Sequence, residues 1–283
     1  MTSEGGRGGG LVLVPTPIGN LGDITLRAIE ALKAAQHIVA EDTRHSRKLL
    51  SHFGIDASRL SRLDANATQA DRERVIGWLL AGQDVALVTD AGSPAVSDPG
   101  SALVRDAIRA GVAVTALPGA SAVTAAVAVS GLIDSAFRFV GFLPRSGPDR
   151  ARGITDIAMS AEPVVLFESA QRMDALLEDL GLAMPAREIV VARELSKLHE
   201  EIVRGTLGEL AAARREWLGE ITIVLGAWSP APQDAPTDED IDRRIDEELS
   251  AGVHTRTASE KIAAWSGRGR REIYARVLER KGR

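Results

Sequence analysis

Short runs of apolar, often β-branched residues alternate along this chain with stretches whose apolar residues recur at helical spacing. Strands that alternate with helices indicate an α/β fold built on a largely parallel sheet. The predicted strands cover residues 11–14, 37–40, 85–88, 112–117, 138–142, 164–167, 188–192 and 221–225. The predicted helices between the early strands cover residues 25–35, 43–53, 69–80 and 98–110.

The length of 283 residues, 45 % of them hydrophobic, allows one large domain or two ordinary ones. A break near Pro118-Gly119 and a polar loop at 144–152 predict two α/β lobes, 11–118 and 119–229. The glycine-rich residues 1–10 predict a disordered leader, and the proline-rich residues 230–236 predict a linker. Residues 237–283 predict a small helical domain with helices near 239–251, 257–265 and 269–280.

The chain contains no cysteine, which excludes disulfides, zinc–thiolate sites and cysteine nucleophiles. Its apolar runs are too short to cross a bilayer, and its start lacks the apolar centre of a signal peptide. We therefore expect a cytoplasmic protein without a membrane segment.

The net charge of −5 argues against a protein that coats nucleic acid, because nonspecific affinity comes mainly from neutralised phosphates. The charge is uneven, however. Residues 233–248 hold eight acids and two arginines, whereas residues 254–283 hold nine lysines and arginines and three acids. The end of the chain is therefore a basic tail on an acidic protein.

Ligands of open α/β sheets bind at the carboxyl ends of the strands, so the loops that follow the strands are the candidate sites. The first loop, residues 15–23, contains two prolines and two glycines but neither a dinucleotide fingerprint nor a phosphate-binding Walker loop. It predicts a close approach of main chain to a ligand, and the alternative is a rigid turn. The second loop begins with Glu41-Asp42, carboxylates that suit ribose binding or proton abstraction, and the alternative is a pair of acids favourable to a helix N-terminus.

The third loop, residues 89–100, consists of small residues and turn formers, which predicts recognition of a ligand by main-chain groups rather than a simple connection. The fourth, residues 117–122, places a glycine before a helix N-terminus and suits a carboxylate or phosphate. In the second lobe, polar residues after two strands predict a rim that faces the first lobe. These residues are Glu168, Arg172, Arg193, Glu194 and Lys197. For Arg193 and Lys197 the alternative is a solvated face with ordinary ion pairs.

Seven segments, in this order, closely resemble the small-subunit rRNA 2′-O-methyltransferase I family of the tetrapyrrole-methylase superfamily. They are VPTPIGNLGDIT (14–25), AEDTRHSRKLLSHFGI (40–55), VTDAGSPAVSDPG (88–100), LPGASA (117–122), GFLPR (141–145), ARELSKLHEE (192–201) and GEITIVLG (219–226). The resemblance implies a two-lobed class III methyltransferase, usually homodimeric. It also implies methylation of a cytidine ribose in the decoding centre of 16S rRNA in the small ribosomal subunit.

The resemblance also places the cofactor, S-adenosylmethionine, in the cleft between the lobes. Its implied contacts lie in the third and fourth loops and at three further superfamily positions. They are Ala91, Gly92, Ser93, Val96, Ser121, Ala122, Ile18, Glu168 and Gly205. The catalytic aspartate of the superfamily's porphyrin enzymes falls at Asp42. The chain departs from the family at Asp64-Ala65-Asn66 and Ala170-Gln171-Arg172, where family members usually have a histidine.

Methyl transfer needs aligned reactants and a group that takes the hydroxyl proton, and it needs no metal. The candidates for proton transfer are Asp42, Glu41, Glu194 and Lys197. For RNA phosphates we expect contacts from the arginines of the loop at 144–152 and of a tail segment that resembles a helix–turn–helix. These are Arg145, Arg150, Arg152, Arg268, Arg270 and Arg271. The tail is alternatively a packed helical hairpin.

Two other functions are open at this point. A methyltransferase for a small molecule such as a porphyrin predicts activity without ribosomal particles. A non-catalytic ribosome-assembly factor predicts no binding of S-adenosylmethionine.

Overall fold

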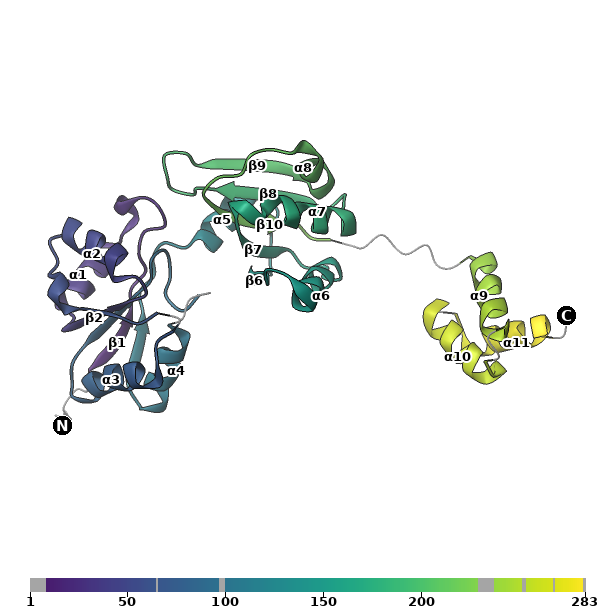
Figure 1. The fold of residues 1–283 in the computed structure, drawn as a ribbon, viewed down its shortest axis with the longest axis horizontal. Coiled ribbons are helices and arrows are strands. Elements are labelled where there is room, and N and C mark those ends of the chain that lie inside the picture. Colours follow the sequence, from purple (N-terminus) through teal and green to yellow (C-terminus); the bar gives the residue numbers. More distant parts are fainter. Residues whose placement is uncertain are drawn as a thin grey trace. The chain divides into compact units, whose positions relative to one another are not determined.

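The computed structural model describes residues 9–64, 66–96, 100–228, 237–250, 253–266 and 268–281 (Figure 1). It divides the chain into two compact units, Met1–Trp228 and Ser229–Arg283. Gly10 already belongs to the first strand, so the predicted leader is wrong at its last residue. The rest of that leader up to residue 8, and the predicted linker at 230–236, lie outside the described residues.

The first sheet is fully parallel, with the order β3-β2-β4-β1-β5. Its strands are β1 (Gly10–Leu13), β2 (His37–Ala40), β3 (Leu60–Arg62), β4 (Val85–Val88) and β5 (Ala113–Ala116). β3 is an addition to the predicted strands. The helices between them are α1 (Leu26–Ala34), α2 (Thr43–His52), α3 (Gln69–Leu80) and α4 (Ser101–Arg109), and short 3₁₀ turns occur at Leu21–Asp23 and Ala57–Arg59. Residues 97–99, where α4 was predicted to start, lie outside the described residues.

The side chains of each strand alternate between two cores, as the pleat of a strand requires. On β2, Ile38 packs with Leu32 of α1 and Leu50 of α2. The next residue, Val39, packs on the opposite face in the core that holds α3 and α4. α1 and α2 thus cover one face of the sheet, and α3 and α4 cover the other.

The helix starts follow from local side-chain chemistry. Thr68 caps α3 through a capping box with Asp71, and Thr25 caps α1 by accepting the N–H of Ala28. Asp42 caps α2 by accepting the N–H of Arg44. The Asp42 cap fixes the start of α2 directly after the carboxyl end of β2.

The second sheet has the order β6-β7-β10-β8-β9, and only β6 and β7 are parallel. Its strands are β6 (Arg138–Phe142), β7 (Val164–Ser169), β8 (Glu188–Arg193), β9 (Glu201–Thr206) and β10 (Glu220–Leu225). The prediction of a largely parallel sheet is therefore wrong for this lobe. The strands β7, β8 and β10 are largely buried and read as continuous apolar runs, which do not reveal strand direction.

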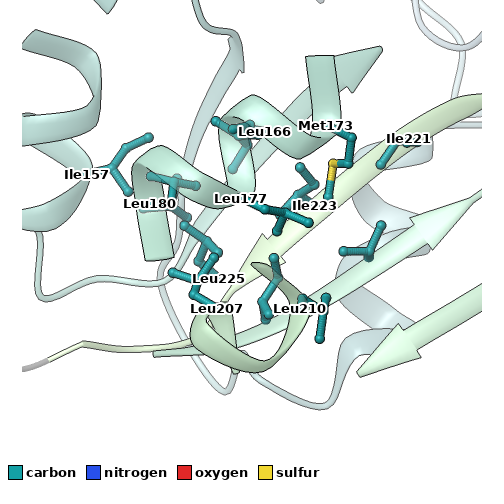
Figure 2. Packing of buried hydrophobic residues seen from close by; sticks show 14 of the residues in the cluster. Ile157, Leu166, Met173, Leu177, Leu180, Leu207, Leu210, Ile221, Ile223 and Leu225 are labelled. Atoms are coloured by element: carbon teal, nitrogen blue, oxygen red, sulfur yellow. The ribbon is translucent and has the colours of Figure 1, made fainter. Parts of the chain in front are cut away.

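Helices α6 (Gly147–Ala158), α7 (Met173–Ala183) and α8 (Leu207–Ala213) cover one face of the second sheet, and a 3₁₀ turn at Ala170–Arg172 leads into α7. Figure 2 shows Leu177 and Leu180 of α7 packed beside Ile223 and Leu225 of β10. Helix α5 (Ala122–Ser130) packs on the other face, where Val123 and Ala126 meet apolar residues of β7, β8 and β10.

A buried arginine joins three parts of the second lobe. The Arg187 guanidinium donates to the carbonyls of Ile157 (2.9 Å), Glu162 (2.8 Å) and Gly226 (2.9 Å). Burial lowers the pKa of Arg187 to about 10. The carbonyls take up its donors, as a buried guanidinium requires.

The second unit consists of α9 (Asp238–Ser250), α10 (Thr255–Ser266) and α11 (Arg270–Lys281), close to the predicted ranges. Ile241, Ile262 and Ile273 lie in its core. The acids of α9 neutralise arginines of α11, since Arg276 donates to Asp242 at 2.6 Å and Arg280 donates to Asp246. Residues 237–281 contain ten acidic and ten basic residues, so α9 offsets the positive charge of the predicted basic tail.

Among the described residues, no helix has the length and apolar character needed to cross a bilayer.

Candidate active site

A pocket of about 370 Å³ lies where the carboxyl ends of the first sheet meet the second lobe. The first lobe supplies Glu41 after β2 and the loop that follows β4. The second supplies the start of α5, the ends of β7 and β8, and the start of β10. The pocket therefore lies where strand-end ligand sites occur in α/β folds.

Main-chain hydrogen bonds join the first and third loops beside the pocket. The Thr16 N–H donates to the Gly92 carbonyl (2.9 Å), and the Gly92 N–H donates to the Thr16 carbonyl (3.0 Å). The buried Thr16 hydroxyl also donates to the Thr89 carbonyl (3.0 Å). This pairing holds the wall of the pocket in place without a large side chain.

Gly92 forms part of that wall in a backbone conformation that other residues rarely adopt. Its φ is +81°, and a Cβ there would lie 3.5 Å from Ile18 Cγ2. The absence of a side chain keeps this part of the pocket open to a bulky ligand.

The N-terminus of α5 opens into the pocket. Ser121, Ala122 and Val123 line it, and the Ser121 side chain makes no capping hydrogen bond. The Ser93 hydroxyl donates to the Ala120 carbonyl (3.4 Å), which ties the third loop to this helix start. A helix N-terminus of this kind is favourable to an anionic group.

Glu168 brings a buried carboxylate to the pocket, and its residue is only 2 % exposed. Its Oε1 accepts the Ser169 N–H (2.7 Å) and the Arg172 Nε–H (2.7 Å). Its Oε2 is buried and has no hydrogen-bond partner among the described residues. A buried acceptor without a partner is costly, so this oxygen is suited to a donor on a bound ligand.

Of the four candidates for proton transfer, Glu41 lines the pocket. Asp42 instead caps α2 and binds the Arg44 guanidinium (2.9 Å). Its hydrogen bonds with the Arg44 side chain and N–H lower the pKa of Asp42 to about 2. The Asp42 N–H donates to Asp90 (3.2 Å), a pocket residue that is not among the predicted site residues.

Glu194 and Lys197 form an ion pair beside the pocket residue Glu220. Lys197 Nζ donates to Glu194 Oε1 and to Glu220 Oε2, both at 2.9 Å, and the Glu220 N–H donates to Glu194. Partial burial acts to lower the pKa of Lys197, but the two carboxylates outweigh it and raise that pKa. Partial burial acts to raise the pKa of Glu194, but the Glu220 N–H and Lys197 outweigh it and lower that pKa.

The first loop contacts this ion pair across the two lobes. A Cβ on Gly19 would lie 2.3 Å from Lys197 Cγ and 2.9 Å from the Leu195 carbonyl. The Ser196 hydroxyl donates to the Asp23 carboxylate in the same region. The tight fit explains why glycine is required at position 19.

The pocket brings together eight of the nine residues predicted to contact a cofactor. They are Ile18, Ala91, Gly92, Ser93, Val96, Ser121, Ala122 and Glu168. Gly205 does not line it. Gly205 lies on β9 opposite Ile189, where a Cβ would come within 2.6 Å of Leu210 Cδ1, so packing against α8 explains this glycine.

The arginines predicted to bind RNA differ in their surroundings. Arg150 is tied to Asp179 (2.7 Å) with its side chain only 12 % exposed, and Arg152 pairs with Asp149. Arg145 is exposed. In the second unit, Arg268, Arg270 and Arg271 are all exposed, and Arg268 pairs with Glu272 (3.1 Å).

Two aromatic residues of the pocket were also missed. Phe142 is 56 % exposed and lies tilted against Phe167, with ring centroids 5.5 Å apart. The segment GFLPR could have predicted Phe142 as a pocket residue, because a phenylalanine at the end of a strand lies where a ligand can stack on it.

Comparison with known proteins matches residues 10–211 to the family of Tetrapyrrole (Corrin/Porphyrin) Methylases. Ribosomal RNA small subunit methyltransferase I of Halalkalibacterium halodurans is 38 % identical, over 94 % of this chain and 93 % of that protein. The protein of the same name from Thermotoga maritima is 43 % identical, over 77 % of this chain and 98 % of its own length. The structure of uroporphyrin-III C-methyl transferase from Thermus thermophilus, complexed with S-adenyl homocysteine, is 20 % identical with a TM-score of 0.55. The match covers 77 % of this chain and 97 % of that structure and supports the two-lobed α/β fold.

Proposed function

Because this chain belongs to the tetrapyrrole methylases, and among them to the ribosomal RNA small subunit methyltransferase I family, we propose that it methylates a cytidine ribose 2′-hydroxyl of 16S rRNA with S-adenosylmethionine as methyl donor. The observation that carries the proposal is the pocket itself. It combines a main-chain wall with two carboxylates. One is Glu168, whose buried Oε2 has no hydrogen-bond partner in the described part of the chain, and the other is Glu41 at the end of β2.

The pocket residues fit such a donor. The start of α5 at Ser121 and Ala122 is suited to the carboxylate of the donor's methionine part. Glu168 Oε2 is suited to accept a hydrogen bond from an amino or hydroxyl group. The small residues Ala91, Gly92 and Ser93 leave room for a flat ring beside the main chain.

When bound, S-adenosylmethionine supplies a methyl carbon on a positively charged sulfur, which a ribose oxygen can attack. The protein must hold that oxygen in line and accept its proton. Glu41 is the best placed of the proposed bases because it lines the pocket and follows β2 directly. Asp42 is a weaker base because its pKa is lowered to about 2.

We propose supporting roles for the other two candidates. The raised pKa keeps Lys197 protonated at neutral pH, so its ammonium is a cation at the rim rather than a base. Glu194 holds that ammonium in place. Removing either group is expected to misplace Glu220, which lines the pocket.

The proposed RNA contacts are the exposed arginines that form no ion pair among the described residues. Arg145 of the first unit and Arg270 and Arg271 of the second are exposed and can reach phosphates. Arg150, Arg152 and Arg268 already bind carboxylates, so a phosphate contact by these three requires an exchange of partners. An rRNA substrate would place the enzyme in the cytoplasm, and the family resemblance implies a homodimer, which light scattering of the purified protein tests.

The deciding experiment maps 2′-O-methylation on 16S rRNA from cells with and without the gene. We expect one cytidine to lose its methyl group without the gene and to regain it when purified protein and S-adenosylmethionine are added to small subunits. Identical methylation maps would refute the rRNA function. Methyl transfer to a porphyrin in the same assay would favour a small-molecule substrate instead.

A further inference from the structure

Helix α2 carries a row of basic side chains on one face, the α2 basic row, formed by Arg44, Arg47, Lys48 and His52. Arg47, Lys48 and His52 follow Arg44 by three, four and eight residues, so the four side chains line one face of a helix. All four are exposed, and together with Ser51 they line one open depression of the surface.

The rest of α2 fixes the direction of this row. Ser46, Leu49 and Leu50 are buried, and Leu50 packs in the core between α2 and the first sheet. Rotation of the helix would expose these residues, so the basic row must face outward.

Among the residues that the structure describes, few acidic groups compensate the charge of the row. Helix α2 contains no acidic residue, and Arg44 pairs with the cap Asp42. Among the described residues, none forms an ion pair with Arg47 or Lys48. Positive groups one turn apart repel each other, and those in the first turn also oppose the helix dipole. An arrangement that is unfavourable in isolation, on a protein with a net charge of −5, becomes favourable when a polyanion covers it.

The row also begins beside the pocket. Glu41 lines the pocket, Asp42 caps α2, and the first basic residue of the row follows two positions later. With about 1.5 Å of rise per residue, the row runs for about 12 Å along the helix axis.

We propose that the α2 basic row binds backbone phosphates of the RNA strand next to the methylated nucleotide. The proposal rests on the proposed function and adds an RNA surface to it. A docked protein would need an apolar or aromatic centre, and a membrane surface would need an apolar face, whereas the exposed side chains of this depression are basic or hydroxyl-bearing.

The test uses a double variant, Arg47→Gln with Lys48→Gln, which removes the two charges that form no ion pair among the described residues. Arg44 stays in place because it binds Asp42. The matched control is Arg105→Gln with Arg109→Gln, which removes the same charge from α4 on the opposite face of the same sheet. Binding to small subunits that lack the methyl group is measured between 0.1 and 1 M salt, and S-adenosylmethionine binding is measured by calorimetry.

We expect the α2 variant to bind the subunits about 10-fold more weakly at the lowest salt. The slope of log affinity against log salt should fall by about 1.4, or about 0.7 for each lost contact with a single strand. KM for the subunit should rise while kcat, cofactor binding and thermal unfolding stay unchanged, and the control should keep the wild-type slope.

Equal slopes for the wild type and the α2 variant would overturn the proposed surface but leave the rRNA function intact. An equal loss of affinity in the α2 variant and the control would mean that the effect comes from net charge alone. That outcome would also overturn the proposed surface. Failure of the wild-type protein to bind or methylate the subunits would overturn both proposals.

Discussion

Arg172 binds Glu168 through a single carboxylate oxygen. Its Nε–H donates to Oε1 at 2.7 Å, and the Ser169 N–H donates to that same oxygen. Oε2 is left as a buried acceptor that lines the pocket. The ion pair thus orients the carboxylate and leaves one oxygen for a ligand.

The first prediction concerns this oxygen. Glu168→Gln should weaken S-adenosylmethionine binding about 10- to 100-fold, since a hydrogen bond to a charged group contributes about 1.5–3 kcal/mol. Calorimetry measures the affinity. Glu178→Gln removes the same charge from an exposed position on α7 and serves as the control. An unchanged dissociation constant in Glu168→Gln would contradict a role in cofactor binding.

The second prediction separates the effect of backbone strain on stability from the effect of Gly92 on cofactor binding. Gly92→Ala and Gly111→Ala each place a side chain at positive φ, +81° and +72°, so each should lower the free energy of unfolding by about 1–2 kcal/mol. Only Gly92 lines the pocket, and a Cβ at Gly111 meets nothing within 4 Å. Urea unfolding should show similar losses, while calorimetry should show weaker cofactor binding for Gly92→Ala alone. Equal cofactor affinity in the two variants would argue against Gly92 as part of the binding wall.

The third prediction compares the two adjacent carboxylates after β2. Glu41→Gln should lower kcat by at least about 100-fold if this group takes the hydroxyl proton. Asp42→Asn should lower it less and should retain the fold, because asparagine also caps helices well. Single-turnover methylation with both substrates saturating measures the chemical step. A larger loss in Asp42→Asn would reverse the roles of the two residues.

Acid unfolding provides an independent check on Asp42. Its pKa is lowered from 3.8 to about 2 in the folded protein, so its stabilising contribution is present above pH 3.8 and is lost as the pH falls through about 2. Asp42→Asn should reduce the acid sensitivity of α2 in this range, as followed by NMR of the helix amides.

The fourth prediction concerns the pair formed by Glu194 and Lys197. The pKa of Lys197 is raised above 10.5, so its contribution is present below that pH and is lost as the pH rises through the raised value. The pKa of Glu194 is lowered below 4.5, so its contribution is lost only as the pH falls through the lowered value. Between these limits the pair should be insensitive to pH. Lys197→Ala should lower methylation, and Lys197→Arg should restore part of it, without shifting the pH–rate profile near neutrality. A profile that shifts with Lys197→Arg would instead identify Lys197 as a titrating base.

Apolar periodicity located the buried strands and most helices well. Predicted helix 69–80 coincides with α3, and predicted strands 37–40 and 85–88 coincide with β2 and β4. The two missed strands, β3 and β9, lie at sheet edges. β3 has only three residues, and β9 contains the charged residues Glu201 and Arg204, as edge strands often do.

The parts of the site that are formed by main chain were predictable from the sequence. The hydrogen-bond partners of its side chains were less predictable. The small residues of the third loop predicted a wall near Gly92, which lines the pocket. The Asp42 carboxylate caps α2, whereas Glu41 lines the pocket. This division of roles depends on the turn between β2 and α2. Glu168 Oε2 lacks a partner within the described ranges because Arg172 donates to the other oxygen, and no local sequence pattern specifies that choice.

The direct junction of β2 and α2 has a geometric consequence. A helix is stiff, so the interval from Glu41 to each outward-facing group on α2 is set by the number of residues between them. For the proposed RNA surface, this fixed interval would set how far from the methylated nucleotide the helix contacts the strand. Insertion of one residue near Arg44 would rotate every later basic side chain of α2 by about 100° about the helix axis. It would misalign the bound strand without changing the reacting groups.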